Sequence, residues 1–89
     1  MNNEEIENLN KIIKNRYNIQ CKLEKYYDFF TFYIYNRNPL YFDEINFISN
    51  EMKKYNLNLI RIGYSCLDNY IFLTFKRWLK KCLYQEMKQ

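Results

Sequence analysis

The chain has 89 residues and a mass of 11.3 kDa, which is enough for one modest hydrophobic core and too little for two. Hydrophobic residues make up 48% of the chain and charged residues 27%, so the composition excludes a disordered tail. The formal net charge of +4 permits binding to nucleic acid without requiring it. We therefore expect a single domain that spans residues 1–89.

The chain uses an unusual set of hydrophobic residues. It has no Ala and no Val, one Gly and one Pro, but 10 Tyr and 7 Phe. Ile, Asn, Lys, Tyr and Phe have AT-rich codons, so this bias points to an AT-rich genome, such as that of a bacterium, its phage or plasmid, or an archaeal virus. The many aromatic residues are therefore weak support, on their own, for a binding surface.

The absence of His excludes a large part of enzyme chemistry. No Ser-His or Cys-His pair can form, and His is the side chain that titrates near neutral pH. Cys21, Cys66 and Cys82 lack the C-x-x-C spacing of zinc sites. The odd number of Cys and the acidic N-terminus, which does not resemble a signal peptide, favour a reducing compartment. We expect a cytoplasmic protein with no membrane segment, no cofactor, no metal and no enzymatic activity.

The first half of the chain predicts a helix and two strands. Apolar residues recur every three or four positions from Glu4 to Tyr17, which indicates a helix, and Asn2 with Glu5 resembles a capping box at its start. From residue 19 to 24 the period changes to two, as in a strand with one face in water. A turn then leads into residues 29–35, which are apolar on both faces and predict a central strand that ends before Pro39.

The second half repeats this order. A helix with acidic residues in its first turn covers roughly residues 43–55, followed by strands at 56–64 and 70–75 with a turn between them. A short third helix is expected from Lys76 or Arg77 to about Met87. The two helix-strand-strand units, 3–37 and 42–77, allow an internal repeat.

Two such units predict an α+β fold with a four-stranded, mostly antiparallel sheet, two helices on one face and the short C-terminal helix. Two strand orders are open. The order 1-2-4-3 is a circular permutation of the ferredoxin-like arrangement, and the order 1-2-3-4 has a parallel central pair joined across the second helix.

The sheet face opposite the helices is the first candidate site. If the helices cover Phe30, Phe32 and Ile34 together with Tyr70 and Phe72, the opposite face is strongly aromatic, and apolar patches of this kind mark interfaces. A second copy, a partner protein, the third helix or stacked bases could cover it. The residues expected on it are Phe29, Tyr33, Tyr35, Ile71, Leu73 and Phe75.

Two further candidates remain open. Lys76, Arg77, Lys80 and Lys81 form a basic cluster beside Trp78, which could meet a phosphate backbone or an acidic protein, or simply be a solvated helix end. The paired turn residues Asp28 and Asp68 could act as acid and base or hold Mg²⁺, although Asp is ordinary in turns.

The sequence thus predicts a small, non-enzymatic binding protein from a phage, virus or other mobile element. It would act by protein contact as an inhibitor or regulator of a host nucleoprotein machine, by analogy with the small, motif-free inhibitors of CRISPR effectors. The alternatives are a nucleic-acid-binding protein that uses the basic C-terminal helix and the aromatic face, and a homodimer that buries this face. The predicted binding residues are Tyr33, Tyr35, Phe75, Lys76, Arg77, Trp78, Lys80 and Lys81.

Overall fold

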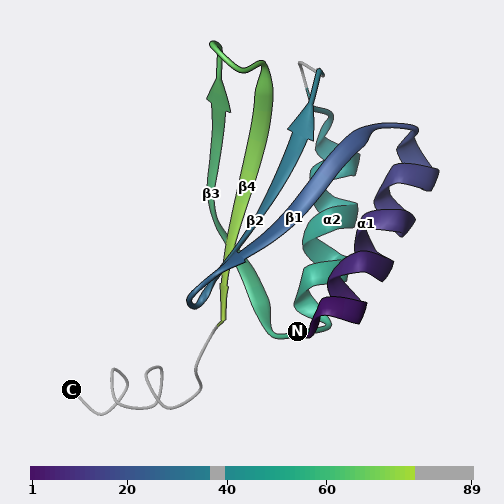
Figure 1. The fold of residues 1–89 in the computed structure, drawn as a ribbon, viewed down its shortest axis with the longest axis vertical. Helices are drawn as coiled ribbons and strands as arrows, with labels where there is room; N and C mark the ends of the chain where they lie inside the picture. The colour runs from purple at the N-terminus through teal and green to yellow at the C-terminus, as the bar shows by residue number, and fades with distance from the viewer. Residues whose placement is uncertain (37–39, 78–89) are drawn as a thin grey trace.

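The computed structural model describes residues 1–36 and 40–77. The elements in chain order are α1 (Asn3–Tyr17), β1 (Gln20–Tyr26), β2 (Phe29–Tyr35), α2 (Phe42–Lys53), β3 (Leu57–Ser65) and β4 (Tyr70–Arg77), as Figure 1 shows. All neighbouring strands are antiparallel and lie in the order β1-β2-β4-β3. The α+β prediction is confirmed with the permuted ferredoxin-like order, and the order 1-2-3-4 is wrong.

The expected third helix lies almost entirely outside the described residues. Its predicted start is wrong, because Lys76 and Arg77 continue β4, where they pair with Asn58 and Leu57 of β3.

The start of α1 is fixed by the predicted capping box. The Asn2 Oδ1 atom accepts a hydrogen bond from the Glu5 backbone N–H at 2.8 Å, and Glu5 Oε1 accepts one from the Asn2 backbone N–H at 2.9 Å. These two bonds satisfy N–H groups that the first helical turn leaves without a partner. α1 ends at Tyr17, and its C-cap residue Asn18 has a left-handed φ of 52°, a conformation that Asn tolerates well.

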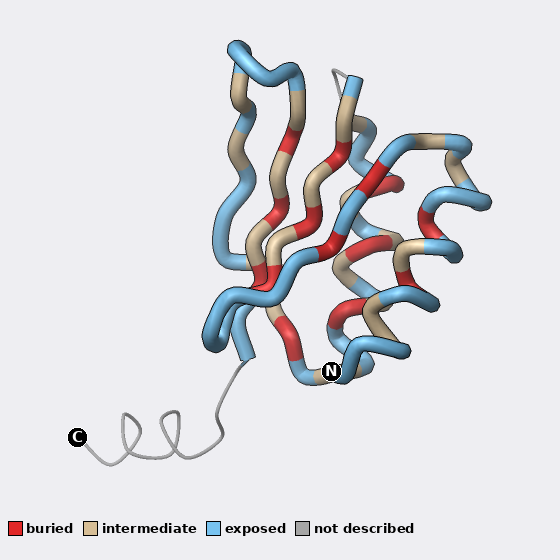
Figure 2. Tube along the Cα trace, viewed as in Figure 1, coloured by how far each residue is buried: buried red, intermediate tan, exposed pale blue. Residues whose placement is uncertain are grey.

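Both helices pack on one face of the sheet, and the core lies between these two layers (Figures 1 and 2). Buried residues alternate with partly exposed ones along β2 and β4, because successive side chains of a strand point to opposite faces. Burying one such large apolar side chain contributes about 1.5–3 kcal/mol. The fully buried members include Ile13, Phe32, Ile34, Ile48, Met52, Leu57, Leu73 and Phe75.

The sequence prediction was right for the faces of β2 and wrong for those of β4. Phe30 pairs with Phe75, and Phe32 pairs with Leu73, so these four side chains share the face that the helices cover. Ile71, also expected on the opposite face, is 6% exposed. Tyr70 and Phe72 consequently lie on the face without helices.

Candidate functional site

The helices α1 and α2 leave one face of the sheet uncovered (Figure 1), here called the open face. This face carries a cluster of aromatic rings. Tyr33 and Tyr35 come from β2, and Tyr70 and Phe72 come from β4. Tyr33 is opposite Phe72 and Tyr35 is opposite Tyr70 in the register of the two central strands. All four side chains are partly exposed. We call these four residues the aromatic cluster.

The rings of the aromatic cluster hold one another in place. Tyr70 packs edge-on against Tyr33, with ring centroids 5.3 Å apart at 81°, and against Tyr35 at 5.9 Å and 67°. The ring of Phe72 lies beside that of Tyr70, with the two ring centroids 6.2 Å apart. Aromatic pairs in this range contribute about 0.5–1.5 kcal/mol beyond the area that they bury. The cluster is therefore preorganised, with Tyr33 and Tyr35 roughly parallel at 20° and Tyr70 edge-on to both.

The Tyr33 hydroxyl stays neutral well above physiological pH. Burial raises the pKa of Tyr33, and the nearby Glu24 carboxylate raises it further. A neutral phenol can donate a hydrogen bond as well as accept one.

Cations also lie on the open face. The Arg61 guanidinium lies 5.4 Å from the centre of the Phe72 ring, and the Lys76 ammonium lies 5.5 Å from the centre of the Phe29 ring. Lys22 Nζ pairs with Glu24 Oε1 at 2.8 Å. Such cation–aromatic contacts are worth about 0.5–1 kcal/mol at exposed sites. The open face thus combines Tyr, Phe and Arg side chains, which are frequent at protein interfaces.

Gly63 on β3 makes room for the Phe72 ring. The two residues are opposite each other, and a Cβ added at Gly63 would come 2.1 Å from the Phe72 Cζ atom. The sequence predicts a strand at 56–64 that contains the single glycine of the chain, but it does not reveal this contact. A glycine within a predicted strand is the one signal that could have indicated a close approach of a large ring from the neighbouring strand.

Of the predicted binding residues, Tyr33, Tyr35 and Lys76 lie on the open face. Arg77 lies at the end of β4, where it lines a small hollow beside Tyr27 and Asp28 in the β1–β2 turn. Phe75 does not belong to the surface: it is 0% exposed in the core, so its predicted outward position was wrong. The remaining three, Trp78, Lys80 and Lys81, lie outside the described residues.

The structure does not bring the two turn aspartates together. Asp28 precedes Phe29, which pairs with Lys76, whereas Asp68 precedes Tyr70, which pairs with Tyr35 at the other end of the same strands. Six residue steps of about 3.4 Å separate the two turns by about 20 Å. This distance is too long for an acid–base pair or a shared ion.

The thiol of Cys21 is buried and has a structural partner. It is 5% exposed, and its Sγ atom donates to the Asn10 backbone carbonyl at 3.8 Å. Burial raises its pKa to about 11, opposed in part by the charge of Lys14, so the nucleophilic thiolate is disfavoured. Over residues 1–36 and 40–77, no group of three His, Cys, Asp or Glu side chains is placed to hold a metal ion.

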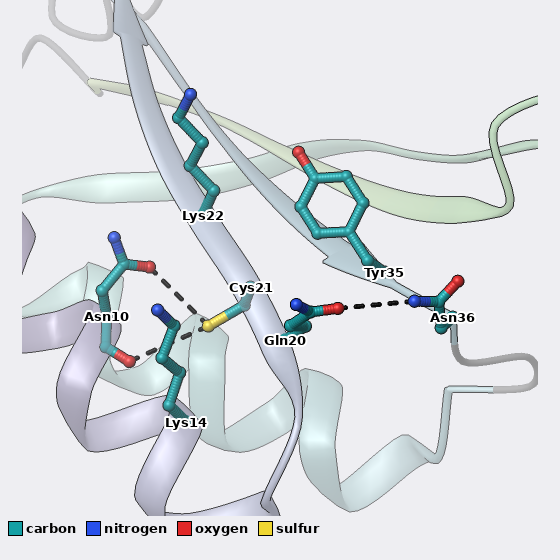
Figure 3. Close-up of a pocket in the computed structure, with 7 residues that line it drawn as sticks. All are labelled: Asn10, Lys14, Gln20, Cys21, Lys22, Tyr35 and Asn36. Atoms are coloured by element: carbon teal, nitrogen blue, oxygen red, sulfur yellow. Dashed lines mark hydrogen bonds between the residues drawn. The ribbon is translucent and has the colours of Figure 1, made fainter.

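A second surface feature is a hollow of about 500 Å³ at the start of β1, the strand at one edge of the sheet. Figure 3 shows Lys22 and Tyr35 on one side of β1 and Asn10 and Lys14 of α1 on the other. The amide of Asn36 donates to Gln20 Oε1 at 3.4 Å at the end of the hollow. Its lining residues are Asn10, Lys14, Gln20, Cys21, Lys22, Tyr35 and Asn36.

Comparison of the chain with known protein families, curated proteins and solved structures found no match. Neither helix in the described part of the chain is long and apolar enough to cross a membrane.

Proposed function

We propose that this chain is a non-enzymatic binding protein that contacts a protein partner through its open face. The observation that supports the proposal is the aromatic cluster, which is partly exposed on a sheet face that the described helices leave uncovered. Contiguous aromatic surfaces of this kind mark interaction sites. Tyr and Arg are also the residue types that most often dominate binding energy at protein interfaces.

The ring geometry favours a protein partner over stacked bases. A base needs the flat face of a ring, and Tyr70 stands nearly perpendicular to Tyr33 and packs against it. Edge-on packing covers part of a ring face and so leaves less flat surface for bases, which favours contacts with the side chains and backbone of a protein.

The distribution of charge points the same way. The whole chain has 14 basic and 10 acidic residues, of which four basic and one acidic lie outside the described residues, leaving 10 and 9. The full chain carries a net charge of +4, whereas the described residues alone are nearly neutral and do not form the strongly basic surface typical of proteins that bind phosphate backbones.

The finer part of the proposal concerns the partner. We infer an inhibitor or regulator from a mobile element, directed at a host nucleoprotein machine. This inference is supported by the small size, the absence of catalytic motifs and the bias toward residues with AT-rich codons. This part rests on analogy, whereas the choice of the open face rests on its geometry.

The proposal is tested by capture of partners from cells that naturally express the protein, with immobilised wild type and single variants. Tyr33→Ala and Phe72→Ala remove rings of the cluster. The matched controls Tyr27→Ala and Phe42→Ala remove rings that are each 77% exposed outside it, in the β1–β2 turn and at the start of α2. Loss of an interface hot spot costs about 2 kcal/mol or more, so we expect the cluster variants to capture the partner at least about tenfold less well than the controls. Equal capture by all four variants would contradict the proposal.

Nucleic-acid binding is the second candidate, and one observation favours it. Arg61 and Lys76 each lie against an aromatic ring on the open face, a combination that single-strand-binding proteins also use. Fluorescence anisotropy of labelled single-stranded RNA and duplex DNA at about 50 and 200 mM salt distinguishes the candidates. Tight binding that weakens steeply with salt would replace the protein partner with a nucleic acid.

A further inference from the structure

The two edges of the sheet differ in regularity. β1 pairs with β2 without a break, from Gln20 opposite Tyr35 to Tyr26 opposite Phe29. β3, the other edge, has an irregularity between Leu59 and Arg61. Bulges of this kind twist an edge away from further pairing, whereas a regular edge presents N–H and C=O groups that another extended segment can bind. β1 is therefore the edge suited to accept a strand.

The hollow at the start of β1 is lined from both sides of the strand. Gln20, Lys22 and Tyr35 contribute on the side of the open face, and Asn10 and Lys14 contribute on the side of α1 (Figure 3). Successive side chains of an added strand would point alternately to these two sides. The hollow thus provides space for both sets of side chains of a segment paired with the first residues of β1, Gln20 to Lys22.

The charges of the hollow select an acidic occupant. Lys14 and Lys22 are the only charged residues among those that line it, and they lie on opposite sides of β1. The ion pair between Lys22 and Glu24 is exposed, with 59% and 47% of the two side chains accessible, so it contributes little to stability. Lys22 can therefore pair with a carboxylate of a bound segment instead of Glu24.

We propose that the edge of β1 binds an extended acidic peptide segment as a fifth strand of the sheet. Two adjacent acidic residues of that segment would point to opposite sides, one toward Lys22 and the other toward Lys14. Backbone hydrogen bonds to β1 would supply affinity, and the two lysines would supply the preference for acidic sequences. This site is distinct from the aromatic cluster except at Tyr35, so it goes beyond the function proposed above.

The probe is a fluorescein-labelled peptide, Thr-Val-Glu-Glu-Val-Thr with blocked ends, titrated with the full chain and followed by anisotropy. We expect saturable binding with a Kd below about 1 mM. Lys14→Glu and Lys22→Glu should each weaken binding about fivefold or more through repulsion. Lys11 is exposed on α1 and lies outside the hollow, so Lys11→Glu should leave peptide binding unchanged. Circular dichroism confirms that each variant is folded.

Two N-methylated peptides separate strand addition from attraction of charge alone. Each carries N-methyl groups at alternate residues, one set on odd and the other on even positions. Only one of the two sets of backbone N–H groups faces β1. The peptide methylated on that set should bind about tenfold more weakly than the parent, and the other peptide should bind about equally well. The proposal is overturned if the parent peptide does not bind at about 1 mM, if the lysine variants bind like wild type, or if both methylated peptides match the parent.

Discussion

The ring of Phe72 lies against Gly63 of the neighbouring strand, where an added Cβ would come 2.1 Å from the ring's Cζ atom. The ring or the strand would have to move to accept any side chain at position 63. Overpacking of this kind costs about 1–3 kcal/mol. Gly63 therefore helps to set the position of Phe72 in the aromatic cluster.

The first prediction concerns this pair. Gly63→Ala should destabilise the wild type but cost at least about 1 kcal/mol less in a Phe72→Ala background, where the clash is gone. Urea denaturation of the two single variants and the double variant measures this coupling. An equal cost of Gly63→Ala in both backgrounds would show that the ring does not limit position 63.

The second prediction concerns the faces of β4. Phe75 is fully buried, so Phe75→Ala should lower the free energy of unfolding by about 3–5 kcal/mol. Phe72→Ala should cost clearly less, because Phe72 is only partly buried. Denaturation curves provide the comparison. A larger loss for Phe72 than for Phe75 would place Phe75 on the surface and contradict the strand register described here.

The third prediction concerns Cys21. Burial raises its pKa from 9.0 to about 11, so the folded state keeps the proton at a pH where the unfolded state loses it. This contribution to stability is complete below pH 9 and is lost as the pH rises toward 11. Wild type should therefore lose more stability than Cys21→Ala between about pH 9 and pH 11, measured by thermal melting of both proteins.

The same environment should protect the Cys21 thiol from modification. In a Cys82→Ser background, a thiol reagent should label the exposed Cys66 rapidly and the buried Cys21 only as the protein unfolds. Equal labelling rates, or parallel pH dependence of wild type and Cys21→Ala, would contradict the buried position of Cys21.

Much of the fold could be predicted from sequence because its local signals are strong. The period of the apolar residues and the pair Asn2 and Glu5 identified α1, and the apolar run at 29–35 identified the central strand. The faces of β4 were harder, since residues 70–73 are apolar at every position and a shift by one residue exchanges the faces. Thr74 and Lys76, which lie on the same face as Tyr70 and Phe72, were the signal that favoured the correct assignment.

The candidate site was predicted only in part for the same reason. Tyr33 and Tyr35 were placed correctly, but Tyr70 and Phe72 were assigned to the core. The contact between Phe72 and Gly63 depends on the pairing of β4 with β3, and the hollow at the start of β1 depends on how α1 lies beside that strand. Neither relationship is encoded in a local pattern.

The most direct test of the proposed function is site-specific photocrosslinking from the open face. Tyr33→p-benzoylphenylalanine places the reactive group in the aromatic cluster, and Tyr27→p-benzoylphenylalanine places it on an exposed turn residue as the control. In cells that naturally express the protein, we predict a crosslink from position 33 to a different protein and none to that protein from position 27. A crosslink from position 33 to nucleic acid, or the same products from both positions, would contradict the account.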